Sequence, residues 1–217
     1  LARVLEKIAA SLIAAASVAF LFCLLRRYLD KRRAALLALL FAFATNTWST
    51  ASQALWQHGM SQLMIVLSLL CLERFLEDQT RWRASAGAGL FAALSVGMRP
   101  TNFMFFGLSA AVLLLGKSRW KLLASYAASG LIVGAPLALY NRQIFGDFRG
   151  GYAGALNGDF FSGLSGLLLS PARGLFVYSP VFLFLFPAVY LWFRSSASRA
   201  RTVYLISLLF SIAHVAL

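Results

Sequence analysis

Charged residues are scarce in this chain, and acidic residues are the scarcest. Of its 217 residues only 12% are charged, with 7 Asp and Glu against 20 Lys and Arg. Soluble domains carry about 25% charged residues. Hydrophobic residues make up 60% of the sequence and lie in long blocks, and the mean hydropathy is +0.76. This pattern excludes an ordinary soluble domain and indicates a protein that crosses a membrane several times.

Candidate metal ligands and nucleotide-binding motifs are also scarce. The two cysteines, Cys23 and Cys71, lie inside apolar runs, where a buried, unreactive thiol is the ordinary case. The two histidines, His58 and His214, are far apart along the chain. The sequence has no Cys-x-x-Cys pair, no P-loop and no dinucleotide-binding fingerprint. It therefore predicts no metal site and no certain cofactor.

A net charge of +13 suggests nucleic acid as a partner, but the distribution of the charge argues against it. Lys and Arg lie in short clusters between apolar blocks, with no basic face and no nucleic-acid-binding motif. Fourteen of the 20 basic residues fall in one set of alternate connections and six in the other. By the positive-inside rule, the richer set faces the cytoplasm. The start of the sequence and the connection over residues 142–177 then face outward.

The apolar blocks predict an all-α fold, because a closed membrane barrel would show short segments of alternating hydrophobicity instead. We predict a polytopic transmembrane helix bundle with about eight hydrophobic helices, several of them short, in a single domain over residues 1–217. A long outer loop is expected at about 142–177. The hydrophobic segments cover residues 8–25, 34–47, 57–75, 84–98, 103–116, 121–141, 178–193 and 203–217.

Arg99 lies between two of these segments and is followed at once by Pro100. The 33 residues between Arg83 and Lys117 would form a helix of about 50 Å, whereas the hydrocarbon core is about 30 Å thick. Both flanks are on the predicted cytoplasmic side, so the segment must turn, and proline favours a turn at Arg99. Each limb has only about 15 residues, or about 22 Å. We therefore expect Arg99 in a recess open to the outside.

The segment 34–47 is also short, because the polar stretch 45–50 ends it early. Polar residues gather on the predicted outer side, and each has two interpretations. Arg99 is either an interfacial arginine or an anion site, and His58 is either an interfacial histidine or a phosphate or sugar donor. Asp147 and Asp159 are either turn residues, or one of them is a catalytic base.

Four stretches together resemble the bacterial GT-C glycosyltransferases, in the broad group around family 39 and the dolichyl-phosphate-mannose transferases. They are "FAFATNTWSTASQALWQHG" (41–59), "GMRPTN" (97–102), "YNRQIFGDFRGGY" (140–152) and "LLLSPARGLFVYSP" (167–180). The resemblance implies a multi-pass enzyme of the bacterial inner membrane with its active site facing outward. A sugar would pass from a polyprenyl-phosphate donor, the lipid-linked substrate, to a hydroxyl on a glycan, lipid or protein acceptor.

The resemblance also implies roles for particular residues. Arg99, His58 and Arg173 would bind the donor phosphate, and the substrate pocket would include Gln57, Asn102, Tyr152 and Tyr178. Such enzymes usually carry their catalytic acid in the first outer loop, which we expect upstream of Leu1, in a longer chain of which this sequence is a fragment. Two other interpretations stay open. One is a multi-span transporter or lipid flippase with an outward-facing anion site, although no inverted repeat or midplane acid supports it; the other is a membrane scaffold.

Overall fold

The computed structural model describes residues 1–78, 80–114, 119–148, 160–172, 174–178, 180 and 183. Every regular element among these residues is a helix and none is a strand, which confirms the all-α prediction. Within these described ranges, three helices are long and apolar enough to cross a membrane: α1 (Ala2–Leu25), α3 (Gln57–Glu77) and α6 (Arg119–Phe145). The count of eight spans stays a prediction, because residues 181–182 and 184–217, which hold most of the last two predicted segments, lie outside the described residues.

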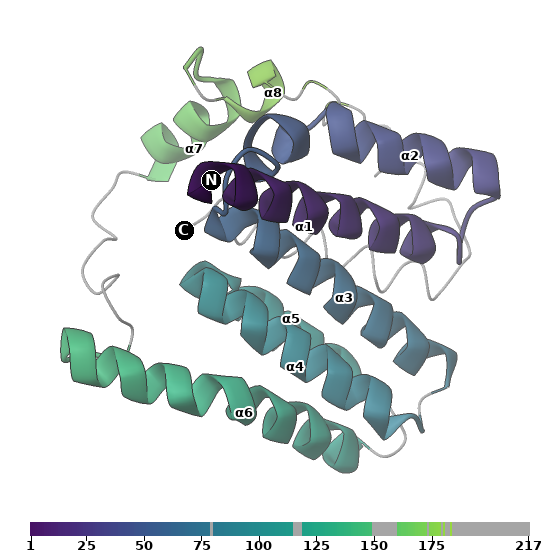
Figure 1. Ribbon diagram of the computed structural model, residues 1–217. Helices are drawn as coiled ribbons and strands as arrows, with labels where there is room; N and C mark the ends of the chain where they lie inside the picture. The colour runs from purple at the N-terminus through teal and green to yellow at the C-terminus, as the bar shows by residue number, and fades with distance from the viewer. Residues whose placement is uncertain are drawn as a thin grey trace. The chain divides into compact units, whose positions relative to one another are not determined.

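The chain divides into two compact units, and α3 passes from the first into the second after Leu63. In the first unit, α1 and α2 (Lys31–Phe43) form an antiparallel hairpin (Figure 1). Asp30 begins α2, because its carboxylate accepts the backbone N–H groups of Arg32 and Arg33 at 3.0 and 3.1 Å. Alanines such as Ala10 and Ala34 are buried in this unit, and side chains this small let helices approach closely.

The polar stretch after α2 forms one turn of π-helix, η1 (Thr47–Ala51). Hydroxyl groups satisfy the carbonyls that the helix end leaves open: Thr45 donates to Phe41 O at 2.6 Å and Ser52 to Trp48 O at 2.7 Å. The Thr45 and Thr47 hydroxyls lie 3.0 Å apart. The prediction that this stretch ends the second segment early is confirmed, since α2 stops at Phe43.

The second unit holds the end of α3 together with α4 (Trp82–Met98), α5 (Phe103–Leu113) and α6. Serine hydroxyls join the helices to one another. Ser68 on α3 donates to Ala88 O at 2.9 Å, and Ser85 on α4 donates to Leu122 O on α6 at 2.8 Å. Tyr126 on α6 is almost fully buried, and its hydroxyl donates to Phe106 O on α5 at 2.9 Å.

The hairpin at Arg99 is present as predicted. α4 ends at Met98, Arg99 is extended with φ −142° and ψ 111°, and the single 3-10 turn η2 (Pro100–Asn102) leads into α5. Ser95 O accepts two hydrogen bonds at this turn, from the Arg99 backbone N–H and from the Asn102 side-chain amide, each at 2.9 Å. The turn is therefore fixed by the residues on both sides of the proline.

The region predicted as the outer loop contains regular structure that the sequence did not indicate. α6 continues to Phe145, past the predicted end at residue 141, and α7 (Phe160–Leu169) and the short α8 (Leu175–Tyr178) follow. Glycine-rich composition suggested a loop over 146–166, but glycine weakens a helix by only about 1 kcal/mol per residue, which an apolar run offsets. The prediction of one long loop over 142–177 is therefore corrected for the described part of that region.

Candidate functional site

A small polar cavity lies where η1 meets the start of α3 in the first unit. It has a volume of about 210 Å³ and is lined by Asn46, Thr50, Ala51, His58 and Gln62. The Gln62 side-chain amide donates to the Thr47 hydroxyl at 2.9 Å, which ties the second turn of α3 to η1. The cavity thus offers amide, hydroxyl and imidazole groups within one small space.

Gly59 allows the two elements to meet so closely. A Cβ atom added at Gly59 would lie 3.3 Å from Ala51 O, which is tighter than nearly all real Cβ contacts. The hydroxyl of Ser11 on α1 adds a further restraint, because it donates to Ser52 O at 3.2 Å. Glu6 on the same helix accepts the backbone N–H of Leu55 at 3.3 Å. The irregular backbone between α2 and α3 is therefore held by contacts with α1 and with the start of α3.

An apolar groove opens on the same η1 segment. It runs between α1 and α2 with a volume of about 520 Å³, and its walls are mostly alanine, valine, leucine and phenylalanine side chains. Thr47, Trp48 and Ser52 also line it. The segment 46–52 therefore lines an apolar groove with some of its residues and a polar cavity with others.

The predicted phosphate-binding residues are not all placed by the structure. His58 is exposed and lines the polar cavity of the first unit. Arg99 is half-buried at the hairpin turn and belongs to the second unit, whereas His58 belongs to the first. Arg173 lies outside the described residues. A shared phosphate site of these three residues stays a prediction.

The predicted pocket residues differ in their surroundings. Gln57 is exposed at the first position of α3, and Tyr178 is 65% exposed with its hydroxyl donating to Pro171 O at 3.1 Å. Asn102 is only 2% exposed, and its amide already donates to Ser95 O, so its described contact holds the Arg99 turn. Tyr152 lies outside the described residues. Their role as substrate contacts stays a prediction.

Sequence reasoning missed the contribution of Asn46, Thr47 and Thr50 to a cavity, because it interpreted the stretch 45–50 only as a helix break. A usable signal was present: a run of hydroxyl and amide side chains at membrane depth needs partners, and irregular backbone there is tolerated only where it is buried or lines a cavity. Of the two acids predicted on the outer side, Asp147 lies two residues beyond the end of α6 and Asp159 lies outside the described residues. No group of three or more His, Cys, Asp or Glu residues that could hold a metal occurs within the described ranges.

Comparison with known proteins gives one finding. A family model described as dolichyl-phosphate-mannose-protein mannosyltransferase matches residues 7–141. No curated protein and no solved structure matches the chain. The matched span is more than half of the sequence and includes η1, both hollows beside it and the Arg99 turn. The chain belongs to the dolichyl-phosphate-mannose-protein mannosyltransferase family, and it is a membrane glycosyltransferase by that membership.

Proposed function

We propose that the protein moves a sugar from a polyprenyl-phosphate donor to a hydroxyl acceptor at the outer face of a bacterial inner membrane. The observation that carries this proposal is the double role of the segment 46–52, which borders an apolar groove and a polar cavity. A lipid-linked sugar has the same two parts, a hydrocarbon chain and a polar head. The donor's isoprenoid chain would occupy the groove, and its sugar would meet the polar cavity.

The family membership supports a lipid-linked donor of this kind. The groove matches its chemistry because apolar walls accept a hydrocarbon chain without leaving polar groups unpaired. In the polar cavity, His58 and Gln62 can donate hydrogen bonds to sugar hydroxyls or to a phosphate oxygen. A water-soluble nucleotide sugar has no hydrocarbon chain, so it would use the cavity alone and would leave the apolar groove unfilled.

Arg99 would act on the leaving group. In the reaction, the acceptor oxygen bonds to the anomeric carbon while the bond from that carbon to the phosphate oxygen breaks. The polyprenyl phosphate leaves with the bonding electron pair, so its negative charge grows, and the acceptor hydroxyl loses its proton to a base. A guanidinium binds such a phosphate through two parallel hydrogen bonds and stabilises the growing charge. His58 and Arg173 would assist at the same phosphate.

The first test is Arg99→Ala in the intact protein, reconstituted in vesicles and assayed with a labelled polyprenyl-phosphate sugar. Loss of one donor that stabilises transition-state charge typically lowers kcat by about 100- to 1,000-fold, and we expect a loss in that range. Arg142→Ala is the control. Arg142 lies on α6 with its guanidinium carbon 5.0 Å from the centre of the Phe148 ring, and it has no assigned role in the reaction. Unchanged turnover and donor affinity in Arg99→Ala would refute the phosphate site.

The second test addresses the groove. Ala42 lines it, so Ala42→Trp would fill part of its volume. We expect a higher KM for a long-chain donor and an unchanged KM for a donor with a short, water-soluble chain. Leu40→Trp is the matched control, because Leu40 lies on α2 but does not line the groove. Equal effects of Ala42→Trp on both donors would contradict the assignment of the chain to the groove.

The same vesicles test the transporter or flippase alternative. A flippase would move the labelled donor between leaflets without an acceptor and without cleaving the sugar from the phosphate. Leaflet exchange that depends on Arg99, with no sugar transfer to any hydroxyl acceptor, would replace the enzyme proposal with that alternative.

A further inference from the structure

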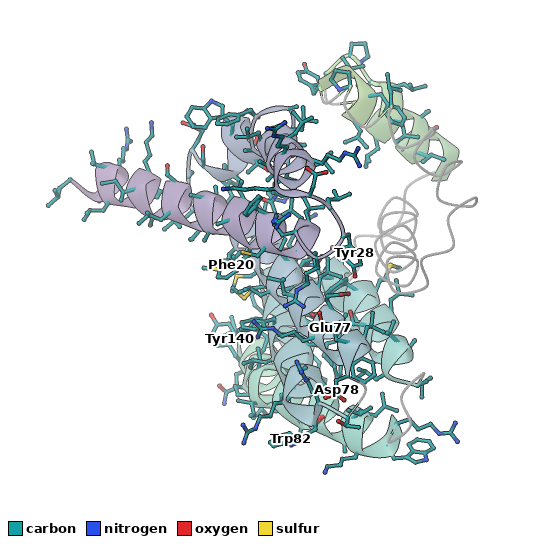
Figure 2. The ribbon with its side chains drawn as sticks, turned by 90° about the vertical axis from the view of Figure 1, so that its right-hand side faces the viewer. Phe20, Tyr28, Glu77, Asp78, Trp82 and Tyr140 are labelled. Carbon is teal, nitrogen blue, oxygen red and sulfur yellow. The ribbon has the colours of Figure 1, made fainter. Side chains whose placement is uncertain are left out.

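A third hollow lies where α3 ends and α4 begins, in the second unit. Figure 2 labels Glu77, Asp78 and Trp82 along this turn. The hollow has a volume of about 440 Å³, within the range of about 300–1,000 Å³ that is typical of small-ligand sites. Among the described residues, three arginines line it, Arg74, Arg81 and Arg83, and no acidic residue does.

One of the three arginines is already neutralised. The Arg81 Nε atom lies 3.2 Å from the Asp78 carboxylate. Asp78 also accepts the Thr80 hydroxyl at 2.7 Å and the Thr80 backbone N–H at 3.1 Å. The hydrogen bond from the Thr80 hydroxyl is the main cause that lowers the pKa of Asp78, so this carboxylate is ionised at neutral pH. The Arg81–Asp78 pair therefore adds little net charge to the hollow.

The other two arginines keep their charge available. Among the described residues, the Arg74 guanidinium makes no hydrogen bond or ion pair, and the Arg74 backbone carbonyl is engaged by the N–H of Asp78. Arg83 lies with its guanidinium carbon 5.6 Å from the centre of the Trp82 ring, a cation–π contact that leaves its N–H groups able to donate. The nearby acids Glu73 and Glu77 do not line the hollow. Two guanidinium groups thus remain as donors to an anion.

The position of the hollow indicates what kind of anion it meets. Trp82 is 46% exposed, and tryptophan is enriched at the level of the lipid headgroups. Cys71 and Ala84 give the hollow an apolar part beside the arginines. The arginines of this turn belong to the connections that the charge asymmetry predicts as cytoplasmic. Anionic phospholipids carry a phosphate at this level, with their hydrocarbon chains directly beside it.

We propose that Arg74 and Arg83 bind the phosphate of an anionic phospholipid in this hollow, with Trp82 at the level of its glycerol. A guanidinium matches a phosphate through paired, charge-assisted hydrogen bonds. The site uses residues other than those assigned to the sugar donor, so it does not depend on the proposed reaction. Its ligand stabilises the α3–α4 turn from the membrane side.

The test measures bound lipid by native mass spectrometry of the intact protein in mild detergent. Phosphatidylglycerol, phosphatidylcholine and water-soluble glycerol phosphate are added in separate samples. A basic residue near an anionic surface contributes about 1 kcal/mol, which is about fivefold in occupancy. We expect preferential binding of phosphatidylglycerol, a loss of about fivefold in Arg74→Gln, and a loss of about 25-fold when Arg83→Gln is added. Equal binding of phosphatidylcholine, or tight binding of glycerol phosphate alone, would overturn the proposal.

Arg119→Gln is the matched control. Arg119 begins α6 and lies 5.7 Å from the centre of the Trp120 ring, so it repeats the arginine–tryptophan contact of Arg83 without lining the hollow. We expect unchanged lipid binding in this variant. An equal loss in Arg119→Gln would reveal a diffuse attraction of basic loops for lipid and would refute a built site. Because the Arg74 side chain makes no hydrogen bond or ion pair among the described residues, Arg74→Gln should fold, and helical circular dichroism checks this.

Discussion

The approach of α4 to α6 at Gly89 leads to the sharpest prediction, for the variant Gly89→Ala. A Cβ atom at this position would overlap the backbone oxygen of Tyr126 and would lie 2.7 Å from the Ser129 hydroxyl oxygen. Carbon atoms in favourable contact are about 3.5–4.0 Å apart. The obstacle is backbone rather than a flexible side chain, so the two helices must separate by on the order of 1 Å.

Such a separation also weakens the hydrogen bonds between the helices. Ser85 donates to Leu122 O at 2.8 Å, and Ser129 donates to Ala86 O at 2.7 Å. Each interhelical hydrogen bond in a membrane contributes about 0.6 kcal/mol, and overpacking costs about 1–3 kcal/mol. The gain from replacing glycine by alanine in a helix is about 0.5–1 kcal/mol. The net expectation is a destabilisation of about 2 kcal/mol.

The assay is equilibrium unfolding of the intact protein in mixed micelles with increasing sodium dodecyl sulfate, followed by circular dichroism. Gly134→Ala on α6 is the matched control, because a Cβ atom there meets no described residue within 4 Å. We expect Gly134→Ala to be neutral or slightly stabilising. If Gly89→Ala unfolds at the same detergent fraction as Gly134→Ala, the close α4–α6 packing described above is wrong.

Three further predictions follow from single contacts. Tyr126→Phe removes the hydroxyl that donates to Phe106 O and should destabilise the protein by about 1 kcal/mol in the same unfolding assay. Asn102→Ala should lower stability by about 1–2 kcal/mol and increase hydrogen exchange at the Arg99 amide, because the turn loses its side-chain donor. Asp30 caps α2, and its backbone hydrogen bond from Arg33 is the main cause that lowers its pKa. Its contribution to stability is therefore present above its unfolded-state pKa and is lost as the pH falls through the lower folded-state value. Asp30→Ala should remove this pH dependence. Asp30→Asn should remove it as well, although its side-chain amide oxygen can still cap the helix. NMR titration of the Asp30 carboxyl checks that its pKa is lowered.

Part of this fold follows from the sequence because the determining physics is local. The turn at Arg99 was predictable from the length of the segment, the charges that flank it and the restriction that Pro100 places on the preceding residue. The end of α2 was predictable as well, because the residues from Thr45 to Thr50 are too polar to continue an apolar span. Both features depend on neighbours in sequence.

The ends of α6 and the cavity beside η1 were not predictable in the same way. Beyond Asn141 the sequence turns polar, yet the helix continues to Phe145, and the Asn141 amide reaches forward to Phe148 O at 3.1 Å. Polarity marks where a helix leaves the hydrocarbon but does not end its hydrogen bonding. The cavity depends on the path of the backbone over residues 52–56, which brings Gln62 to Thr47. No periodicity in the sequence predicts that path.

The packing of the chain explains why a polar site can exist beside η1. Lipid chains are as apolar as leucine, so membrane helices associate through close packing and hydrogen bonds rather than through hydrophobic burial. Ser68, Ser85 and Gly89 supply both between the helices of the second unit. In the first unit, Thr45 and Ser52 satisfy the carbonyls that η1 and the end of α2 leave open. With these backbone groups satisfied internally, the amide of Gln62 and the imidazole of His58 can face a cavity and serve a ligand, as the proposed binding of a lipid-linked sugar requires.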